Sequence, residues 1–206
     1  MKNENDFAEF VGIMLGDGCL SPNRIQITLD SRNTSYINYV SNLLCKLFEV
    51  NVVQSFRKGE NTCDVRVFNK KLIGSLSEEK GLILSPKWNR AKVPSSLFEN
   101  KLILDVLRGY FDTDGCVVIT NNNGTLYPRI EMKVCPSPMQ NQLIDGLNRY
   151  GFKFGVYQIG KGKVRIQLNG KTQLYKWFKL IGSKNVDKLE RFHKMLNLGK
   201  NSEERI

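Results

Sequence analysis

The strongest constraint on this fold is a motif of ten residues that occurs twice in the chain. Residues 10–19 (FVGIMLGDGC) correspond to residues 107–116 (LRGYFDTDGC), which places Asp17 and Asp114 at matched positions 97 residues apart. Self-similarity of this kind indicates two diverged copies of one structural unit. A fold with internal twofold pseudo-symmetry is therefore expected.

The segments after the motif also correspond, and they show where the two copies differ. Residues 24–27 match residues 129–132 at a separation of 105, so the second copy has a loop eight residues longer. The sequence Asn-Asn-Asn-Gly at 121–124 lies in that loop. We predict an N-terminal repeat over residues 1–94 and a C-terminal repeat over residues 95–206.

Hydrophobic periodicity predicts the same order of elements in both units. Residues 6–9 (DFAE) have the pattern of a capping box, which predicts a helix that runs to Gly16, and residues 96–99 (SLFE) have it ahead of the second copy. Polar and apolar residues alternate in four later segments, which predicts half-buried strands at residues 24–29, 62–68, 129–134 and 163–169. Each unit is then α-β-β-α-β-β-α. This is an α+β fold in which an antiparallel four-stranded sheet has helices on one face and leaves the other face open.

The predicted open faces carry mostly basic and amide side chains. A merely solvated face usually mixes Lys with Glu, whereas these faces carry few acids. Arg, Lys, Gln and Thr match the hydrogen-bonding patterns of base edges and phosphates. The net charge of +11, from 31 basic and 20 acidic residues, also favours a polyanionic partner. We predict nucleic-acid contacts by Arg24, Gln26, Thr28, Arg66, Arg129, Glu131, Lys133, Lys163, Arg165 and Gln167.

Other features of the composition exclude several classes of protein. The five cysteines show no short-spaced pair and His193 is the only histidine, so ordinary zinc-ligand spacing cannot be met. The N-terminus carries acids early, and no segment has the ~18 apolar residues of a membrane span. We expect an intracellular protein, in the cytoplasm or nucleoid of a prokaryote or in an organelle. Trp88 and Trp177 are expected to pack in the core or between the units.

The two motif helices each end at an Asp-Gly pair. A single such pair is usually only a C-cap, because glycine accepts the left-handed conformation. Both copies, however, contain small residues four positions apart, which allow two helices to pack closely. These residues are Gly12 and Gly16, then Gly109 and Thr113. A pseudo-twofold axis would bring Asp17 and Asp114 together beside the free carbonyls of the last turns, an oxygen-only site suited to magnesium and to phosphodiester hydrolysis.

Residues 10–18 and 107–115 resemble the two signature helices of LAGLIDADG homing endonucleases, specifically the compact monomeric kind with two repeats. The resemblance covers essentially the whole chain. It implies a saddle of two four-stranded sheets astride the DNA major groove. It also implies a free-standing, intron-encoded enzyme that cleaves both strands of a long asymmetric target with a divalent metal and leaves short 3′ overhangs.

The resemblance also implies roles for individual residues. The metal would be held by the eighth letter of each motif and by the backbone carbonyl before it, namely Asp17, Asp114, Gly16 and Thr113. At the sixth letter the first copy has Leu15 where the second has Asp112. That position is not the usual metal ligand in the family, so the departure of the first copy is expected to have little consequence.

The family also places a basic or polar side chain near each scissile phosphate. Lys87 follows Ser85-Pro86 and Lys184 follows Ser183, so these lysines occupy matched places, and Lys133 is a third candidate. The expected metal is Mg²⁺, with Mn²⁺ as a substitute and Ca²⁺ supporting binding without cleavage. The expected partner is double-stranded DNA, bound by a monomer.

Two other interpretations remain open at this point. The chain could be an RNA maturase that binds intron RNA, or a DNA-binding regulator, because both reuse this fold with or without its acids. Retention of both Asp17 and Asp114 favours the nuclease, since binding alone gives no physical reason to keep paired carboxylates beside a polyanion. An unrelated basic structural protein would require the doubled motif to be accidental.

Overall fold

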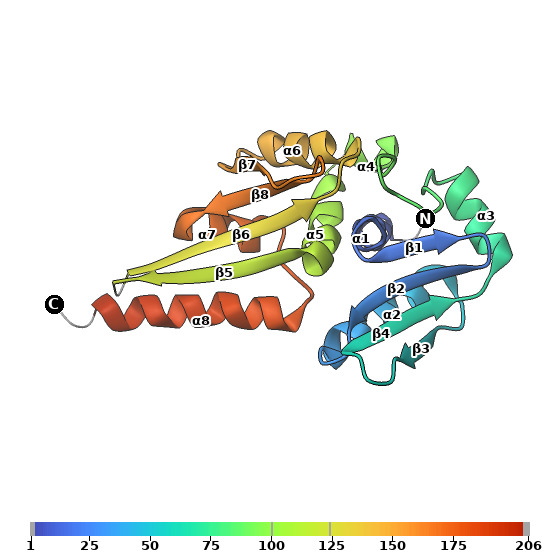
Figure 1. The fold of residues 1–206 in the computed structure, drawn as a ribbon, viewed down its shortest axis with the longest axis horizontal. Coiled ribbons are helices and arrows are strands. Elements are labelled where there is room, and N and C mark those ends of the chain that lie inside the picture. Colours follow the sequence, from blue (N-terminus) through green and yellow to red (C-terminus); the bar gives the residue numbers. More distant parts are fainter. Residues whose placement is uncertain (1–2, 100, 124, 204–206) are drawn as a thin grey trace.

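A computed structural model describes residues 3–99, 101–123 and 125–203, without the side chains of residues 196–203. The first half contains, in order, α1 (Glu4–Leu15), β1 (Gly18–Ser21), β2 (Arg24–Asp30), α2 (Thr34–Phe48), β3 (Val53–Phe56), β4 (Thr62–Val67) and α3 (Lys70–Glu78). The second contains α4 (Ser95–Phe98), α5 (Ile103–Asp114), β5 (Gly115–Asn122), β6 (Thr125–Val134), α6 (Met139–Arg149), β7 (Gly155–Gln158), β8 (Val164–Asn169), α7 (Gly170–Leu180) and α8 (Val186–Glu203). The predicted repetition of elements is confirmed, with α4 and α8 as additions (Figure 1).

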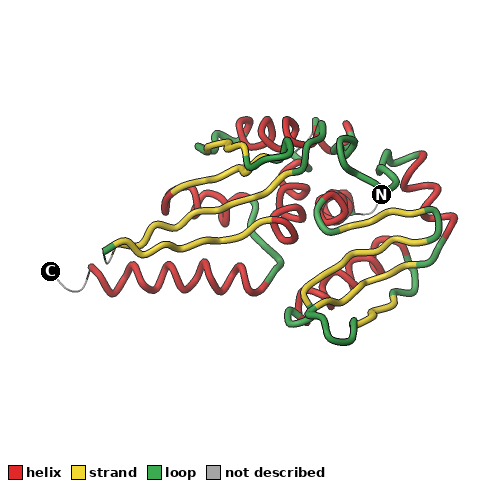
Figure 2. Tube along the Cα trace, in the orientation of Figure 1, coloured by secondary structure: helices red, strands yellow, loops and turns green. Residues whose placement is uncertain are grey.

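Each half forms one antiparallel four-stranded sheet. The strand orders are β1-β2-β4-β3 and β5-β6-β8-β7, so the two sheets have the same topology. Helices α2 and α7 cover one face of their sheets, and the opposite faces are turned toward the viewer and stay open (Figures 1 and 2). The α+β expectation is therefore confirmed, including the open faces.

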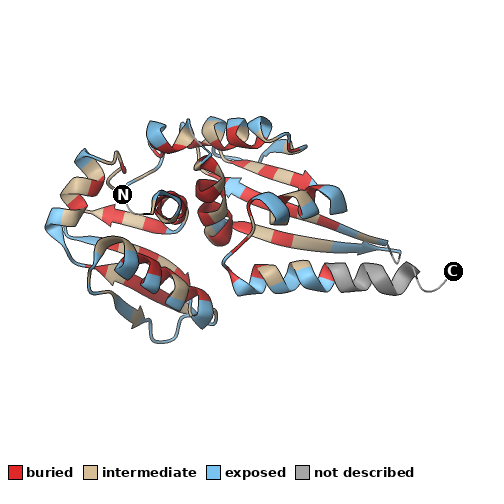
Figure 3. Ribbon diagram, turned by 180° about the vertical axis from the view of Figure 1, so that it is seen from behind, coloured by how far each residue is buried: buried red, intermediate tan, exposed pale blue. Residues whose placement is uncertain are grey.

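The apolar positions of the strands point at the helices, as the alternation predicts. Ile25, Ile27 and Val65 are fully buried in the first half, and Ile166 and Leu168 in the second. Figure 3 shows the buried residues along the helix-facing sides and between the two halves. The alternation fixes which face of each strand is covered, because successive side chains point to opposite faces.

Helices α1 and α5 pack against each other at the centre of the molecule. A Cβ on Gly12 would lie 2.1 Å from the carbonyl oxygen of Val106, and a Cβ on Gly109 would lie 2.1 Å from that of Glu9. Each glycine thus admits the backbone of the other helix at the matched position. The close packing predicted from small residues is confirmed for this pair of glycines.

The helix starts differ from the capping boxes that the sequence suggests. Asn3 is the N-cap of α1, and its side-chain oxygen accepts from the backbone N–H of Asp6. Asp6 instead binds Lys46 through its carboxylate at 2.6 Å. Residues 96–98 belong to the short helix α4, with Glu99 as its C-cap, while α5 begins later without a side-chain cap. Asn3 prevails because it is also a strong N-cap residue and lies one turn earlier.

The two tryptophans differ sharply in their surroundings. Trp177 is fully buried, with its ring 4.9 Å from that of Phe111, so its predicted packing is confirmed. Trp88 is 43% exposed, so the expectation that it is covered is wrong. It lies in the segment that connects the halves and lines a cleft there.

The connecting segment is hydrogen-bonded to the second half. The N–H of Asn89 donates to the carbonyl of Pro136 at 2.8 Å, and the N–H of Met139 donates to the carbonyl of Ala91 at 3.0 Å. Gln142 binds both backbone groups of Val93. Across the described residues, no helix combines the length and apolar character that crossing a membrane requires.

Candidate functional site

Asp17 and Asp114 stand where the two central helices end. Asp17 follows Gly16, the C-cap of α1, and Asp114 is the last residue of α5. A Cβ on Gly16 would lie 2.8 Å from a carboxylate oxygen of Asp114 and 2.1 Å from the hydroxyl of Thr113. Both aspartates line one cleft of about 340 Å³. The tertiary structure therefore brings the two acids together, as the pseudo-symmetry predicts.

The electrostatics of the pair reflect its crowded surroundings. The protein around Asp114 desolvates its carboxyl and, together with the charge of Asp17, raises its pKa to about 6. Desolvation also raises the pKa of Asp17, although Lys188 and Lys87 oppose this. Both residues keep solvent contact, so their hydration is reduced rather than removed. Because the charge of Asp17 disfavours ionisation of Asp114, the pair would be stabilised by a shared cation.

Lys87, one of the candidate lysines, lies at the end of α1. Its ammonium donates to the carbonyl oxygens of Met14, Leu15 and Gly16 at 2.7, 3.0 and 2.8 Å. Burial lowers the pKa of Lys87, while Asp114 and Asp17 oppose that shift. The lysine thus neutralises the negative end of the helix and stands in the same cleft as both acids.

A second lysine, which sequence reasoning missed, occupies the matched place on α5. The ammonium of Lys188 donates to the carbonyl of Phe111, three residues before Asp114, as Lys87 does to that of Met14, three residues before Asp17. Lys188 is only 9% exposed, and burial lowers its pKa to about 8 although Asp112 and the paired acids oppose this. Repeat register could not have found Lys188, because it lies 101 residues after Lys87, whereas the motifs are 97 residues apart and Lys184 keeps that spacing.

Lys184, the predicted counterpart of Lys87, is placed differently. Its side chain is exposed, and its backbone N–H donates to a carboxylate oxygen of Asp112 at 2.7 Å. Asp112 also accepts from the hydroxyl of Ser183 at 2.5 Å, and its carbonyl accepts from the side chain of Asn185. The sixth motif letter of the second copy therefore anchors the loop before α8, and that loop leads to Lys188.

The donors at the helix ends fit a divalent cation of the magnesium type. Two carboxylates supply negative charge, and among the described residues no group of three or more His, Cys, Asp or Glu forms a richer site. Mg²⁺ is commonly held by one or two carboxylates while it keeps several waters. The carbonyl of Gly16 already accepts from Lys87, so it would serve the metal through its second lone pair. Thr113 bonds the carbonyls of Gly109 and Tyr110 through its hydroxyl.

The open face of the first sheet carries an acid at its centre. Asp64 is fully buried and accepts from Thr28 at 2.8 Å, from Arg57 at 3.0 Å and from Arg66 at 2.5 Å. Burial would raise the pKa of Asp64, but the hydrogen bonds and charges of these partners hold it below its usual range. The predicted contact residues Gln26, Thr28 and Arg66 share this face with it. The alternation of polar and apolar residues in this strand puts Asp64 on the same face as Arg66, so the sequence could have revealed this acid.

The open face of the second sheet has a similar but differently placed cluster. Glu131 accepts from Arg129 at 2.6 Å and lies 3.8 Å from Arg165. Lys133 pairs in register with Arg165, and it also lines the cleft that contains both aspartates. Arg24, Lys163 and Gln167 are likewise at least partly accessible. The predicted contact residues therefore gather on the two open faces.

Comparison with known proteins gives a family for the second half of the chain. Residues 101–195 match the family model of the LAGLIDADG-like domain. A sequence search among curated proteins returned no match. The matched residues include α5, Asp114 and Lys188, which form half of the candidate site.

Solved structures with the same fold cover most of the chain. The homing endonuclease I-WcaI bound to its DNA recognition sequence aligns with a TM-score of 0.63 at 16% identity, over 86% of this chain and 80% of that one. I-DmoI in complex with DNA and Mn aligns with a TM-score of 0.59 at 15% identity, over 87% of this chain and 97% of that one. Full-length DUF199/WhiA from Thermatoga maritima aligns with a TM-score of 0.60 at 14% identity, over 98% of this chain and 68% of that one. At these identities the likeness is one of fold, and it confirms the two-repeat LAGLIDADG architecture.

Proposed function

We propose that this chain, which has the two-repeat LAGLIDADG fold and a LAGLIDADG-like domain over residues 101–195, is a site-specific double-strand DNA endonuclease. One observation carries the proposal. Asp17 and Asp114 meet at the ends of two pseudo-symmetric helices, and Lys87 and Lys188 hold matched carbonyls of those helices. A fold that only binds nucleic acid would gain nothing from two carboxylates next to the phosphates.

The aspartates would hold the divalent metal, for which Mg²⁺ is the expected ion. Bound there, the metal would lower the pKa of its water and stabilise charge on the leaving oxygen. Lys87 and Lys188 add positive charge on both sides of the acid pair, where a phosphate of either strand would lie. We place the catalytic lysine of the second half at Lys188 rather than at Lys184.

The two open sheet faces would bind the DNA major groove on either side of the cleft. Each face would cover about one helical turn, which suggests a target on the order of 20 base pairs. Asp64 forms ion pairs with the arginines of the first face. On the second face Glu131 does so from a non-equivalent position. The halves therefore present different side chains, and we expect an asymmetric target.

Selection of cleaved duplexes from a random-sequence library tests the proposal. The protein is incubated with the library in Mg²⁺ and in Ca²⁺, beside the Asp17→Asn and Asp114→Asn variants, with folding checked by circular dichroism. We expect one long motif with staggered central breaks, leaving 3′ overhangs, from the unaltered protein in Mg²⁺ only. We expect both variants to bind without cutting.

A non-cleaving nucleic-acid binder is the second candidate. Three carbonyls at the end of α1 already accept from Lys87, so the site is partly neutralised without a metal and could hold a phosphate alone. The same library distinguishes the two functions. Recovery of bound but uncut duplexes from the folded protein under every metal condition would favour a regulator, and preferential binding of structured RNA would favour a maturase.

A further inference from the structure

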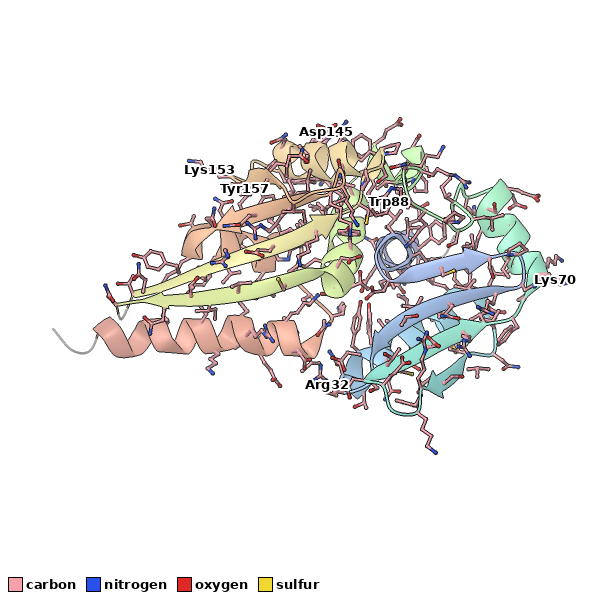
Figure 4. All side chains as sticks on the ribbon, viewed as in Figure 1. Arg32, Lys70, Trp88, Asp145, Lys153 and Tyr157 are labelled. Atoms are coloured by element: carbon pink, nitrogen blue, oxygen red, sulfur yellow. The ribbon has the colours of Figure 1, made fainter. Side chains whose placement is uncertain are left out.

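Trp88 is an exposed aromatic residue directly beside the candidate catalytic centre. It follows Lys87 in the chain, and it lines the cleft that contains Asp17 and Asp114. Its side chain is 43% exposed, although a buried position is usual for a large aromatic residue. Figure 4 shows Trp88 at the junction of the two halves, near α1 and the end of β6.

The backbone around Trp88 is held in place. The N–H groups of Arg90 and Ala91 donate to the carbonyl of Lys87 at 2.9 and 2.8 Å, which closes a tight turn. Asn89 adopts a left-handed conformation with φ 62° and donates to Pro136 of the second half. These hydrogen bonds hold the backbone of the turn, so ordering that backbone adds little cost when a ligand binds at the cleft.

Basic side chains surround the indole. The ammonium of Lys163 lies 5.4 Å from the centroid of the Trp88 ring. Lys133 lines the same cleft. An aromatic ring between cations is the combination that binds single or distorted strands, because bases stack on the ring while the cations attract the backbone.

The other side of the acid pair has no equivalent. The cleft around Lys188 is lined by Asp30, Asn33, Cys116, Val117, Asn185, Asp187 and Arg191. None of these described lining residues is aromatic. The position after Lys188 is Leu189, which is partly buried on α8. Of the described residues that line these two clefts, an exposed aromatic side chain therefore stands only in the cleft beside Lys87.

We propose that Trp88 is a nucleic-acid contact residue whose indole stacks on a base or sugar of one strand at the cleavage centre. This proposal rests on the proposed function. Because the opposite side lacks an aromatic residue, the two strands are held unequally. Loss of the indole should slow cleavage of one strand more than that of the other, so nicked duplex should accumulate.

Tryptophan fluorescence tests the contact directly. In Ca²⁺, a fluorescein-labelled random-sequence duplex of about three helical turns is titrated with the Trp177→Phe variant, in which Trp88 is the only tryptophan. Anisotropy reports binding, and indole emission reports the surroundings of Trp88. We expect the emission to change over the same concentration range as the anisotropy.

Substitution measures how much the contact contributes. Trp88→Ala should bind the duplex about 5- to 150-fold more weakly, as expected for the loss of one stacked base at ~1–3 kcal/mol. Trp88→Phe should recover part of that loss, and Tyr175→Ala is the matched control. Tyr175 is 49% exposed but lies on α7, on the covered side of its sheet, so its loss should not weaken binding.

Three outcomes decide the matter. Binding seen by anisotropy without any change in indole emission would overturn the stacking proposal and leave the endonuclease proposal intact. Wild-type affinity and even strand cleavage in Trp88→Ala would do the same. Failure of the folded wild-type protein to bind duplex DNA would overturn both proposals.

Discussion

At the scale of single residues, the most consequential difference lies between Lys184 and Lys188. Of these two lysines, only Lys188 donates to a carbonyl at the end of α5 and lowers the pKa values of both aspartates. We expect Lys188→Met to lower the rate of DNA cleavage by about 10²–10³-fold, the usual effect of removing one electrostatic stabiliser. Single-turnover cleavage assays measure this rate.

Lys184→Met is the control for that substitution. It removes an exposed ammonium four residues before Lys188. The backbone N–H of residue 184, which donates to Asp112, is preserved. Cleavage at close to the wild-type rate is expected. Equal losses from the two variants would contradict the assignment of Lys188.

A second residue-scale prediction concerns the ion pair between the two central helices. Arg108 donates to Glu9 at 2.6 Å, and Glu9 is 1% exposed and also accepts from Tyr39. Arg108→Met would leave the Glu9 carboxylate buried without its cation. We expect a loss of about 3–5 kcal/mol in the free energy of unfolding, measured by denaturant titration.

An exposed ion pair provides the comparison. Arg32 and Asp30 form a pair at 2.5 Å with side chains 72% and 45% exposed. Arg32→Met should leave the free energy of unfolding nearly unchanged, because water screens and replaces the interaction. A similar cost for both substitutions would show that burial of the Glu9 pair matters less than the structure indicates.

At the scale of secondary-structure elements, the packing of α1 on α5 places the acid pair. The glycines at the crossing leave no room for a methyl group, because the nearest carbonyl would lie 2.1 Å from a Cβ on Gly12. Gly12→Ala should therefore push the helices apart and cost at least about 3 kcal/mol of unfolding free energy. Thermal and denaturant unfolding measure it.

Gly74→Ala is the matched control within another helix. Gly74 lies in α3, and a Cβ there would meet nothing within 4 Å. Alanine should be neutral or stabilise the protein by up to about 1 kcal/mol, because it reduces the entropy of the unfolded chain. Destabilisation by both substitutions would argue against helix crossing as the cause.

At the scale of the whole molecule, a net charge of +11 predicts binding that weakens steeply with salt. The logarithm of the DNA association constant should fall linearly with the logarithm of the salt concentration. Lys133→Gln should reduce the magnitude of that slope by about one, as expected for the loss of one phosphate contact. Lys179→Gln, on α7 and away from the open faces, should leave the slope unchanged. Anisotropy titrations at several salt concentrations give the slopes.

The sequence by itself determined the repeat, the strand faces and the pairing of Asp17 with Asp114. These follow from local periodicity and from symmetry, since a repeated motif must place matched residues in matched surroundings. Covering helices such as α2 and α7 were implied as well, because alternating strands leave one apolar face to bury. The fold class therefore follows from the pattern of residues alone.

Only the tertiary structure decided which side chains surround the acids. Lys188 and Lys87 lie on non-equivalent elements, a terminal helix and a connecting segment, so no repeat register aligns them. Asp112 binds the loop before Lys188, which is 71 to 73 residues away in the chain. The exposure of Trp88 depends on how the connecting segment packs on the second half. Such contacts depend on long-range packing and on loop geometry, for which local sequence patterns carry little information.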